Sequence, residues 1–308
     1  MNHTHSVMFH HFHNEDHLKS QGSLSSFEFS QMLDWLDSKF NLLGAKEYLN
    51  RLNEGQLGSK DICLSFDDAL LCQYDVALPV LNDRSLGAFF FVYSSVFTGQ
   101  PDKLEIFRYF RTNAYENTDE FYQDFFALVE SNFSDEFTDH RSQFSELDYL
   151  SSYSFYTEND KWFRYLRDQF LNQNIYNNFM QQLMERKNFS SEEIVNNLWM
   201  SEAHLKEISE NGHEVGLHSF SHPTKISKLS YDDQNKEYML NYNHLSKLLG
   251  NIVSMSHPCG DYNNETLSIL SKLGIQIGFR SSFNPRTIKS KLEIPREDHI
   301  NILKQMKS

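Results

Sequence analysis

The chain of 308 residues is long enough for one large domain or two smaller ones, and its 39% hydrophobic content can form a substantial core. Its formal net charge of −14 argues against a protein that binds nucleic acid, because phosphate contacts need clustered Lys and Arg. The same charge argues against attachment to an anionic membrane surface.

The cysteines and the N-terminal segment indicate a compartment. Cys63, Cys72 and Cys259 form no CxxC pair, and so sparse a set fits a reducing environment better than a disulfide framework. The opening MNHTHSVMFHHFHN has no basic region followed by a long apolar run, so no signal peptide is expected. No segment approaches the roughly 20 apolar residues that span a bilayer. We therefore predict a cytoplasmic protein without a membrane span.

Strand and helix patterns alternate in the first hundred residues. Apolar runs predict strands, and apolar residues at helical spacing after a Ser25 or Ser26 cap predict a helix. The predicted segments are a strand at 7–12, a helix at 25–40, and strands at 62–66 and 86–95. This alternation is typical of an α/β architecture with parallel strands.

The pattern changes in the middle of the chain. From about 97 to 200 the sequence is polar, aromatic and helix-like, with almost no Gly or Pro. We predict that this segment is a largely helical insertion in a single domain spanning 1–308. The alternation then resumes, with helices predicted at 201–212, 231–250 and 265–274 and strands at 213–222, 252–256, 275–281 and 291–298.

Two short motifs carry groups that could bind a metal. CLSFDDAL ends a predicted strand in Asp67 and Asp68, and HEVGLHSFSHP places His218 and His222 four residues apart. Each motif alone is weak, because adjacent aspartates usually form a solvated turn and such histidines are often surface residues. Together, Asp68, His218 and His222 supply one oxygen and two nitrogens, a set that suits Zn²⁺ or another divalent metal. Asp67 would then lie beside the metal-bound water, as a general base must.

These motifs resemble those of a known family. SFDDA is similar to the TFDDG motif of the polysaccharide deacetylases, the NodB-homology group of carbohydrate esterase family 4. HSFSH resembles that family's H-[ST]-x-x-H motif, and SHPCGDYN resembles its third motif, R-x-P-[YF]-G. The motifs fall in the family's order, and the resemblance covers 7–96 and 201–299.

The resemblance implies a fold, an activity and roles for particular residues. The fold would be a distorted (β/α) barrel with its site at the carboxyl ends of the strands. The activity would be hydrolysis of an N-acyl group, usually acetyl, from an amino sugar. Asp67 matches the family's catalytic base, and Asp68, His218 and His222 match its ligands for one divalent metal. We expect Zn²⁺, with Co²⁺ or Ni²⁺ as alternatives. The backbone amide of Cys259 matches a position that helps to bind the oxyanion.

The sequence departs from the family pattern at three positions. Ala69 replaces the glycine of TFDDG, and Cys259 replaces the aromatic residue of the third motif. The sulfur of Cys259 is expected to be a packed group and not a nucleophile. Ser256 falls where the family has the arginine that partners the base. Arg296, in EIPRED, could supply that partner from the last strand, or it could be a surface ion-pairing residue.

The general acid has no clear motif, and His10, His11 and His299 are the candidates. Strand alternation over the segment 291–298 would turn His299 away from the face that carries Arg296. His10 and His11 follow the first strand, whose end lies at the mouth of a barrel. An aromatic–His pair in some relatives resembles Phe9–His10. We therefore predict His10 as the acid.

The leading hypothesis is a metal-dependent deacylase that acts on an amino sugar linked to a nucleotide, a lipid or a nascent glycan such as O-antigen. Two alternatives stay open: a non-catalytic carbohydrate-binding protein that kept the barrel, and a metal amidohydrolase or deformylase acting on another amide. The helical insertion could form a lid, narrow the substrate range or mediate dimerisation, and the sequence leaves the oligomeric state open.

Overall fold

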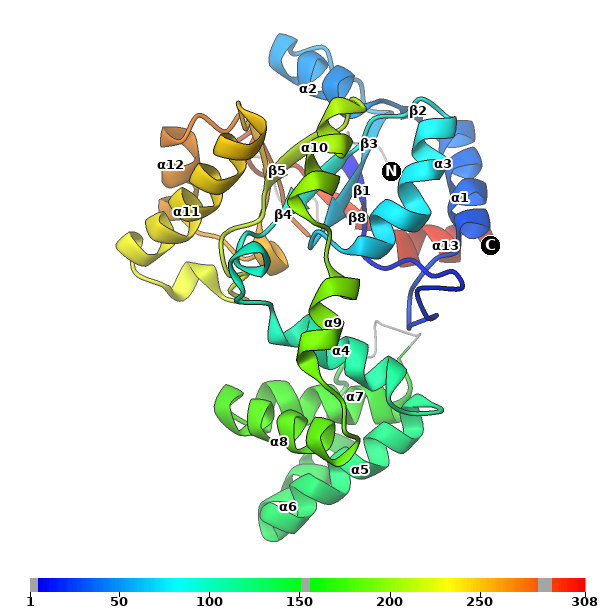
Figure 1. Ribbon diagram of the computed structural model, residues 1–308, viewed down its shortest axis with the longest axis vertical. Coiled ribbons are helices and arrows are strands. Elements are labelled where there is room, and N and C mark those ends of the chain that lie inside the picture. The colour runs from blue at the N-terminus through cyan, green and yellow to red at the C-terminus, as the bar shows by residue number, and fades with distance from the viewer. Residues whose placement is uncertain (1–4, 151–155, 282–289, 308) are drawn as a thin grey trace. The chain divides into compact units, whose positions relative to one another are not determined.

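The computed structural model describes residues 5–150, 156–281 and 290–307. The chain divides into two compact units, one formed by Met1–Asp102 with Asn197–Ser308 and the other by Lys103–Asn196. The first unit contains the sheet, and the second is built from helices (Figure 1). The segment predicted as a helical insertion, about 97–200, contains the second unit.

The sheet of the first unit is parallel and nearly closes on itself. Its strands are β1 (His5–Phe9), β2 (Asn41–Leu42), β3 (Asp61–Asp67), β4 (Phe89–Val92), β5 (Glu214–Leu217), β6 (Ser254–Ser256), β7 (Ile277–Phe279) and β8 (Arg296–Asp298). They follow the order β7-β6-β5-β4-β3-β1-β8, with β2 beside β3, and all pairings are parallel. A parallel bridge between Phe279 and Ile294 joins β7 to the segment that leads into β8. The predicted distorted (β/α) barrel is confirmed.

Helices connect the strands of this unit. They are α1 (Ser26–Lys39), α2 (Ala45–Glu54), α3 (Leu78–Asp83), α10 (Glu202–Glu210), α11 (Tyr231–Leu249), α12 (Asn264–Lys272) and α13 (His299–Lys307). Of the two caps predicted for α1, Ser25 is the one used. Its Oγ accepts a hydrogen bond from the Glu28 N–H, and the Glu28 carboxylate accepts one from the Ser25 N–H.

The end of the first unit differs from the prediction. The strand expected over 291–298 is shorter, because β8 covers only Arg296–Asp298. His299 begins α13 and does not continue the strand. Strand alternation therefore does not determine the direction of the His299 side chain relative to that of Arg296.

Side chains inside the barrel fall into an apolar layer and a polar layer. The apolar layer packs Phe89 and Phe91 of β4 against Phe279 of β7, with ring centroids 5.1 and 5.4 Å apart. The polar layer contains Asp67 and Ser256, whose side chains are 3.3 Å apart. Because β4 and β5 separate β3 from β6 in the sheet, this contact crosses the interior. The polar layer thus lies where the carboxyl ends of the strands converge.

The helical unit has an aromatic core of its own. Its helices are α4 (Lys103–Asn113), α5 (Thr118–Asn132), α6 (Ser134–Ser145), α7 (Glu158–Tyr165), α8 (Gln173–Arg186) and most of α9 (Ser191–Leu198). Phe163 of α7 packs edge-on against Phe121 and Phe125 of α5, with centroids 5.3 and 4.9 Å away. Trp162, Phe163 and Tyr165 are all buried, as expected of core residues and not of a sugar-stacking surface.

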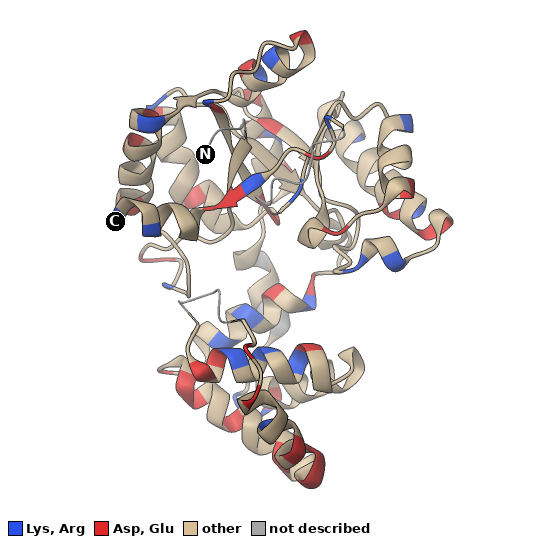
Figure 2. Ribbon diagram, turned by 180° about the vertical axis from the view of Figure 1, so that it is seen from behind, with Lys and Arg blue, Asp and Glu red and all other residues tan. Residues whose placement is uncertain are grey.

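Charged residues of both signs are distributed over the elements of both units (Figure 2). Figure 2 shows Lys and Arg positions scattered among Asp and Glu positions in both units. Among the described residues, no helix combines the length and the apolar character needed to cross a bilayer.

Candidate metal and acid–base site

The two adjacent aspartates leave β3 through an unusual turn. In a strand, successive side chains point to opposite faces. Asp68 and Ala69 instead have φ values of 79° and 54°, which breaks the alternation. As a result both carboxylates approach one imidazole: His218 Nε2 lies 3.9 Å from Asp67 Oδ2 and 3.4 Å from Asp68 Oδ1. Ala69 adopts the left-handed region where the family motif has glycine, at a cost of about 1 kcal/mol.

Asp68, His218 and His222 form a cluster that could hold a metal ion, with ligand atoms all within 4.8 Å of one another. Asp68 Oδ1 is 3.4 Å from His218 Nε2 and 3.5 Å from His222 Nε2. Two ligands of a tetrahedral Zn²⁺ with bonds of about 2.1 Å are separated by roughly 3.4 Å. Asp68 Oδ1 is buried and has no hydrogen-bond partner. The donor set and its spacing therefore fit a divalent metal.

A hydrogen bond orients the imidazole of His218, and a nearby carboxylate faces that of His222. His218 Nδ1 lies 2.9 Å from the carbonyl oxygen of Ser256, so it carries the proton and leaves the Nε2 lone pair facing Asp68. His222 Nδ1 faces the carboxylate of Asp102 at 3.5 Å. Each ring thus presents Nε2 to the cluster, an arrangement typical of metal-binding histidines.

Backbone contacts hold the loop that carries the two histidines. The His218 N–H donates to the Val92 carbonyl at 3.1 Å and to the side-chain oxygen of Asn241 at 3.0 Å. The carboxylate of Glu237 on α11 accepts hydrogen bonds from the N–H groups of Phe220 and Ser221. These hydrogen bonds to β4 and α11 fix the HSFSH segment, and they therefore help to set the distance between the two histidines.

The electrostatics of the cluster favour a bound cation. Burial lowers the pKa of His222, but Asp102 and Asp68 outweigh burial and raise the pKa to about 9. Burial also opposes ionisation of Asp68, yet His218, His222 and His10 hold the pKa of Asp68 far below its usual range. The Asp68 carboxylate therefore stays ionised, and its negative charge attracts a cation.

Asp67 is held by an arginine from the last strand. The Arg296 guanidinium donates to Asp67 Oδ1 at 2.7 Å and to Oδ2 at 2.6 Å, a bidentate pair that is almost fully buried. Ser256 Oγ accepts from the same guanidinium at 2.8 Å. Burial raises the pKa of Asp67, but Arg296 and His218 more than compensate, so the pKa lies below its usual range. Arg296 is therefore no surface residue.

The histidine candidates for a general acid lie in different places. His10 Nε2 is 3.9 Å from one carboxylate oxygen of Asp67 and 3.9 Å from one of Asp68. His11 lies next to it, with ring centroids 6.4 Å apart. His299 is buried, stacks on Phe9 and approaches the Gly22 carbonyl at 2.8 Å. The structure brings His10 to the two aspartates, whereas His299 contacts β1, the loop before α1 and the adjacent Asp298 of β8.

Cys259 lies in a short turn after β6, with a φ of 52°. The residue is exposed, yet desolvation of its thiol and the nearby Asp68 and Asp102 carboxylates raise the pKa of Cys259 to about 12. A thiol with this pKa is protonated at neutral pH and is a poor nucleophile. Any part that Cys259 has in the chemistry would thus come from its backbone.

Two residues near the site carried no recognisable sequence signal. Asp102 lies in a polar stretch, QPDK, that resembles any loop. Asn241 lies inside α11, where its side chain donates to the Val92 carbonyl at 2.9 Å and to Ser94 Oγ at 2.6 Å. Both support histidine ligands from segments distant in sequence, so neither spacing nor composition could identify them.

We expect Asp102→Asn to weaken binding of a divalent metal by about ten- to a hundredfold, because the neutral amide no longer supports His222 electrostatically. The measurement is a competition titration of Zn²⁺ against a chromophoric chelator. Asp83→Asn, which alters an exposed carboxylate at the end of α3, is the matched control and should bind as the unaltered protein does. Equal affinities for the two variants would show that Asp102 does not support the site.

Comparisons with known proteins agree with this fold. Residues 171–278 match a family model described as polysaccharide deacetylase. The fold is similar to that of the Streptococcus pyogenes deacetylase PplD in complex with acetate, with 17% identity and a TM-score of 0.55, covering 95% of this chain and 90% of that chain. IcaB from Ammonifex degensii shows 15% identity and a TM-score of 0.55, covering 96% and 91%. A de-N-acetylase from Aggregatibacter actinomycetemcomitans shows 12% identity and a TM-score of 0.54, and the match covers 95% of this chain and 93% of that chain. No curated protein sequence matches the chain.

The fold and the site define a parallel (β/α) barrel with a candidate metal centre at the carboxyl ends of its strands. The family match over 171–278 and the shared barrel confirm the predicted resemblance to the polysaccharide deacetylases.

Proposed function

We propose that this protein is a metal-dependent hydrolase that removes an N-acyl group, in the first instance acetyl, from an amino sugar of a polysaccharide or its precursor. The observation that carries the proposal is the position of Asp67. It is fixed by Arg296 and lies beside, but outside, the Asp68, His218 and His222 cluster. One carboxylate is thus available as a base next to a site for a metal.

In the proposed reaction Asp67 takes a proton from the attacking water. Its lowered pKa keeps it ionised at neutral pH, and the bidentate Arg296 contact holds both oxygens in place. A divalent metal bound by Asp68, His218 and His222 would polarise the acyl carbonyl and acidify the water. The backbone N–H of Cys259 would donate a hydrogen bond to the oxyanion as it develops.

The departing amine needs a proton, and His10 is proposed to give it. This imidazole is partly exposed at the end of β1 and lies close to both aspartates. A group in this position can reach the leaving nitrogen while Asp67 stays with the water. Loss of the acyl group then gives a free amino sugar and a carboxylate, so the atoms of one water are consumed.

Three features guide the choice of substrate. The family match points to a polysaccharide. The predicted cytoplasmic location favours an amino sugar still attached to a nucleotide, a lipid or a growing glycan such as O-antigen. The acidic surface argues against a polyanionic polymer as the substrate.

The test is release of acetate or formate from a panel of substrates by protein reconstituted with Zn²⁺, Co²⁺ or Ni²⁺. The panel holds N-acetyl- and N-formyl-amino sugars, as free oligosaccharides and as nucleotide-linked forms, together with simple non-sugar amides. We expect release from amino sugars, about one metal per chain, and loss of both metal and activity in His222→Ala. His204→Ala, on α10, is the matched control. Turnover of non-sugar amides alone would overturn the substrate class.

A non-catalytic binding protein is the competing function. Two features of the sequence support it: Ser256 stands at the position of the family's arginine, and the general acid has no clear motif. The bidentate contact between Arg296 and Asp67 weakens that support, because the partner of the base comes from β8. Absence of turnover over the whole panel by protein with one bound metal per chain would favour the binding protein.

A further inference from the structure

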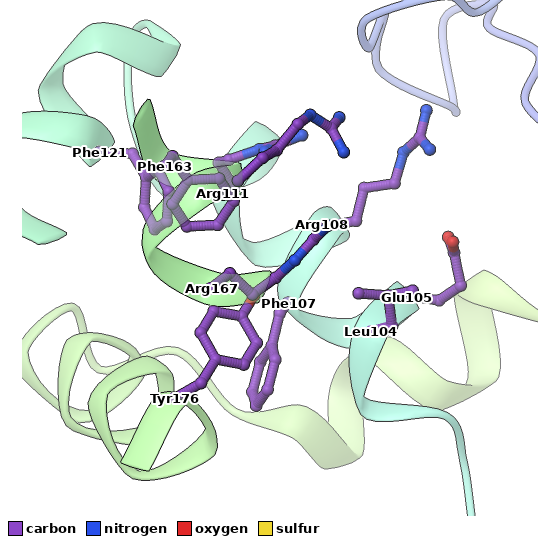
Figure 3. A pocket seen from close by; sticks show the side chains of 10 residues that line it. Leu104, Glu105, Phe107, Arg108, Arg111, Phe121, Phe163, Arg167 and Tyr176 are labelled. Carbon is purple, nitrogen blue, oxygen red and sulfur yellow. The ribbon is translucent and has the colours of Figure 1, made fainter. Parts of the chain in front are cut away.

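The helical unit contains a small cavity lined by four arginines. Its volume is about 90 Å³, several times what one water needs. Arg108 and Arg111 come from α4, Arg164 from α7, and Arg167 from the helical turn that follows α7. Figure 3 shows the side chains of Arg108, Arg111 and Arg167 beside the rings of Phe107, Phe163 and Tyr176. Glu105 is the single carboxylate among the ten lining residues.

Aromatic rings hold the arginines in place. The Arg111 guanidinium lies 5.6 Å from the centroid of Phe163, and that of Arg167 lies 6.0 Å from the same ring. Arg164 lies over Tyr156 at 4.1 Å. Rings of this kind orient a guanidinium without neutralising it.

The positive charge in the cavity is only partly compensated. Arg167 is paired with Asp168 at 2.6 Å. Within the described ranges, no carboxylate lies within ion-pair distance of Arg111 or Arg164, and the buried Arg164 Nε has no hydrogen-bond partner. Burial lowers the pKa of Arg164, and the neighbouring Arg167 and Arg111 lower it further. Several buried positive charges around one cavity destabilise the fold unless an anion binds between them.

We propose that this cavity binds a phosphate group. A guanidinium presents a planar set of donors that matches phosphate oxygens bidentately, and several of them converge here in a protein with a net charge of −14. The cavity lies wholly within the helical unit and is distinct from the Asp67 and Asp68 site of the barrel. The inference goes beyond the proposed deacylation and does not depend on it.

The phosphate could belong to a free ion, a nucleotide or a lipid headgroup, and the shared chemistry is the phosphate. Calorimetric titrations of the full chain at low ionic strength use inorganic phosphate, pyrophosphate, uridine diphosphate and dihexanoyl phosphatidic acid. We expect binding of pyrophosphate that weakens as NaCl is added. Tighter binding of uridine diphosphate indicates a nucleotide, tighter binding of the lipid indicates a headgroup, and equal binding indicates the free ion.

Variants assign the binding to the cavity. Arg111→Gln and Arg164→Gln should each weaken pyrophosphate binding by at least about tenfold. Arg186→Gln, which removes an exposed arginine from α8, is the matched control and should bind normally. His222→Ala should also bind normally, because the metal cluster is elsewhere.

A variant that is merely less stable is recognised by the shift in Tm that pyrophosphate causes. This shift, about 3 °C at saturating ligand, compares each variant with itself. It should vanish in Arg111→Gln and Arg164→Gln and partly return in Arg111→Lys. The proposal is overturned if none of the four probes binds, if Arg186→Gln loses binding equally, or if His222→Ala alone abolishes it.

Discussion

Replacing Asp67 with asparagine is expected to lower kcat/KM for deacylation by about two to four orders of magnitude while about one metal per chain stays bound. The amide cannot accept a proton at neutral pH, whereas the ligand cluster of Asp68, His218 and His222 is unchanged. Acetate release measures the first effect and elemental analysis the second.

Stability needs attention in this experiment, because Asp67→Asn leaves the buried Arg296 without its carboxylate. Assays should therefore run well below the Tm of the variant. Asp83→Asn serves again as the control for a carboxylate-to-amide change, and it should keep full activity. If Asp67→Asn retained activity within about threefold of the unaltered protein, the assignment of the base would be wrong.

Arg296→Met should lower the free energy of unfolding by about 3–5 kcal/mol at neutral pH, because it leaves the buried Asp67 carboxylate without its cationic partner. Chemical denaturation at pH 7 measures this loss. Arg84→Met is the control: Arg84 forms a partly exposed ion pair with Asp34, so its replacement should cost about 1 kcal/mol or less.

The same variant should change the pH dependence of both stability and activity. Arg296 holds the pKa of Asp67 below its unfolded value of about 3.9. The pair therefore stabilises the fold fully above that value, and the contribution is lost as the pH falls through the folded pKa. In Arg296→Met the pKa of Asp67 rises, so the base becomes protonated at a higher pH. The acid limb of the activity profile should move upward.

A second substitution tests whether the arginine can be relocated. Adding Ser256→Arg to Arg296→Met puts a guanidinium on β6, where the family's third motif has one. Because Ser256 Oγ already lies 3.3 Å from Asp67 Oδ2, the double variant should recover part of the stability and return the acid limb toward lower pH. If Arg296→Met alone left both measurements unchanged, the pair would have no role in stability or in tuning the base.

Local patterns identified the residues that gather at the metal cluster. Asp67 and Asp68 lie at the end of β3, and His218 and His222 follow β5. The carboxyl ends of parallel strands meet at one end of a barrel. The helix α1 was likewise predictable, since Ser25 and Glu28 form a capping box before an apolar stripe. In each case neighbouring residues carry the information.

The features that the sequence did not reveal depend on contacts between distant segments or lack a local signal. The sequence left two interpretations of Arg296 open, because nothing local shows that β8 lies beside β1. Strand alternation was extended to His299, whereas this residue begins α13. The helix α2 was not predicted, because it begins at Gly44 without a side-chain cap and is rich in polar residues. Asp102 reaches His222 only through the course of the folded chain.

The pairing of Asp67 with Arg296 has a consequence for folding order. The two residues are 229 positions apart, so the contact is among the most non-local in the chain. Such contacts form late, after the entropy of closing a long loop has been overcome. Until β8 docks, the carboxylate at the end of β3 has no guanidinium to neutralise it and favours a solvated, open barrel. Placing the partner on β8 thus couples docking of the last strand to formation of the Asp67–Arg296 ion pair.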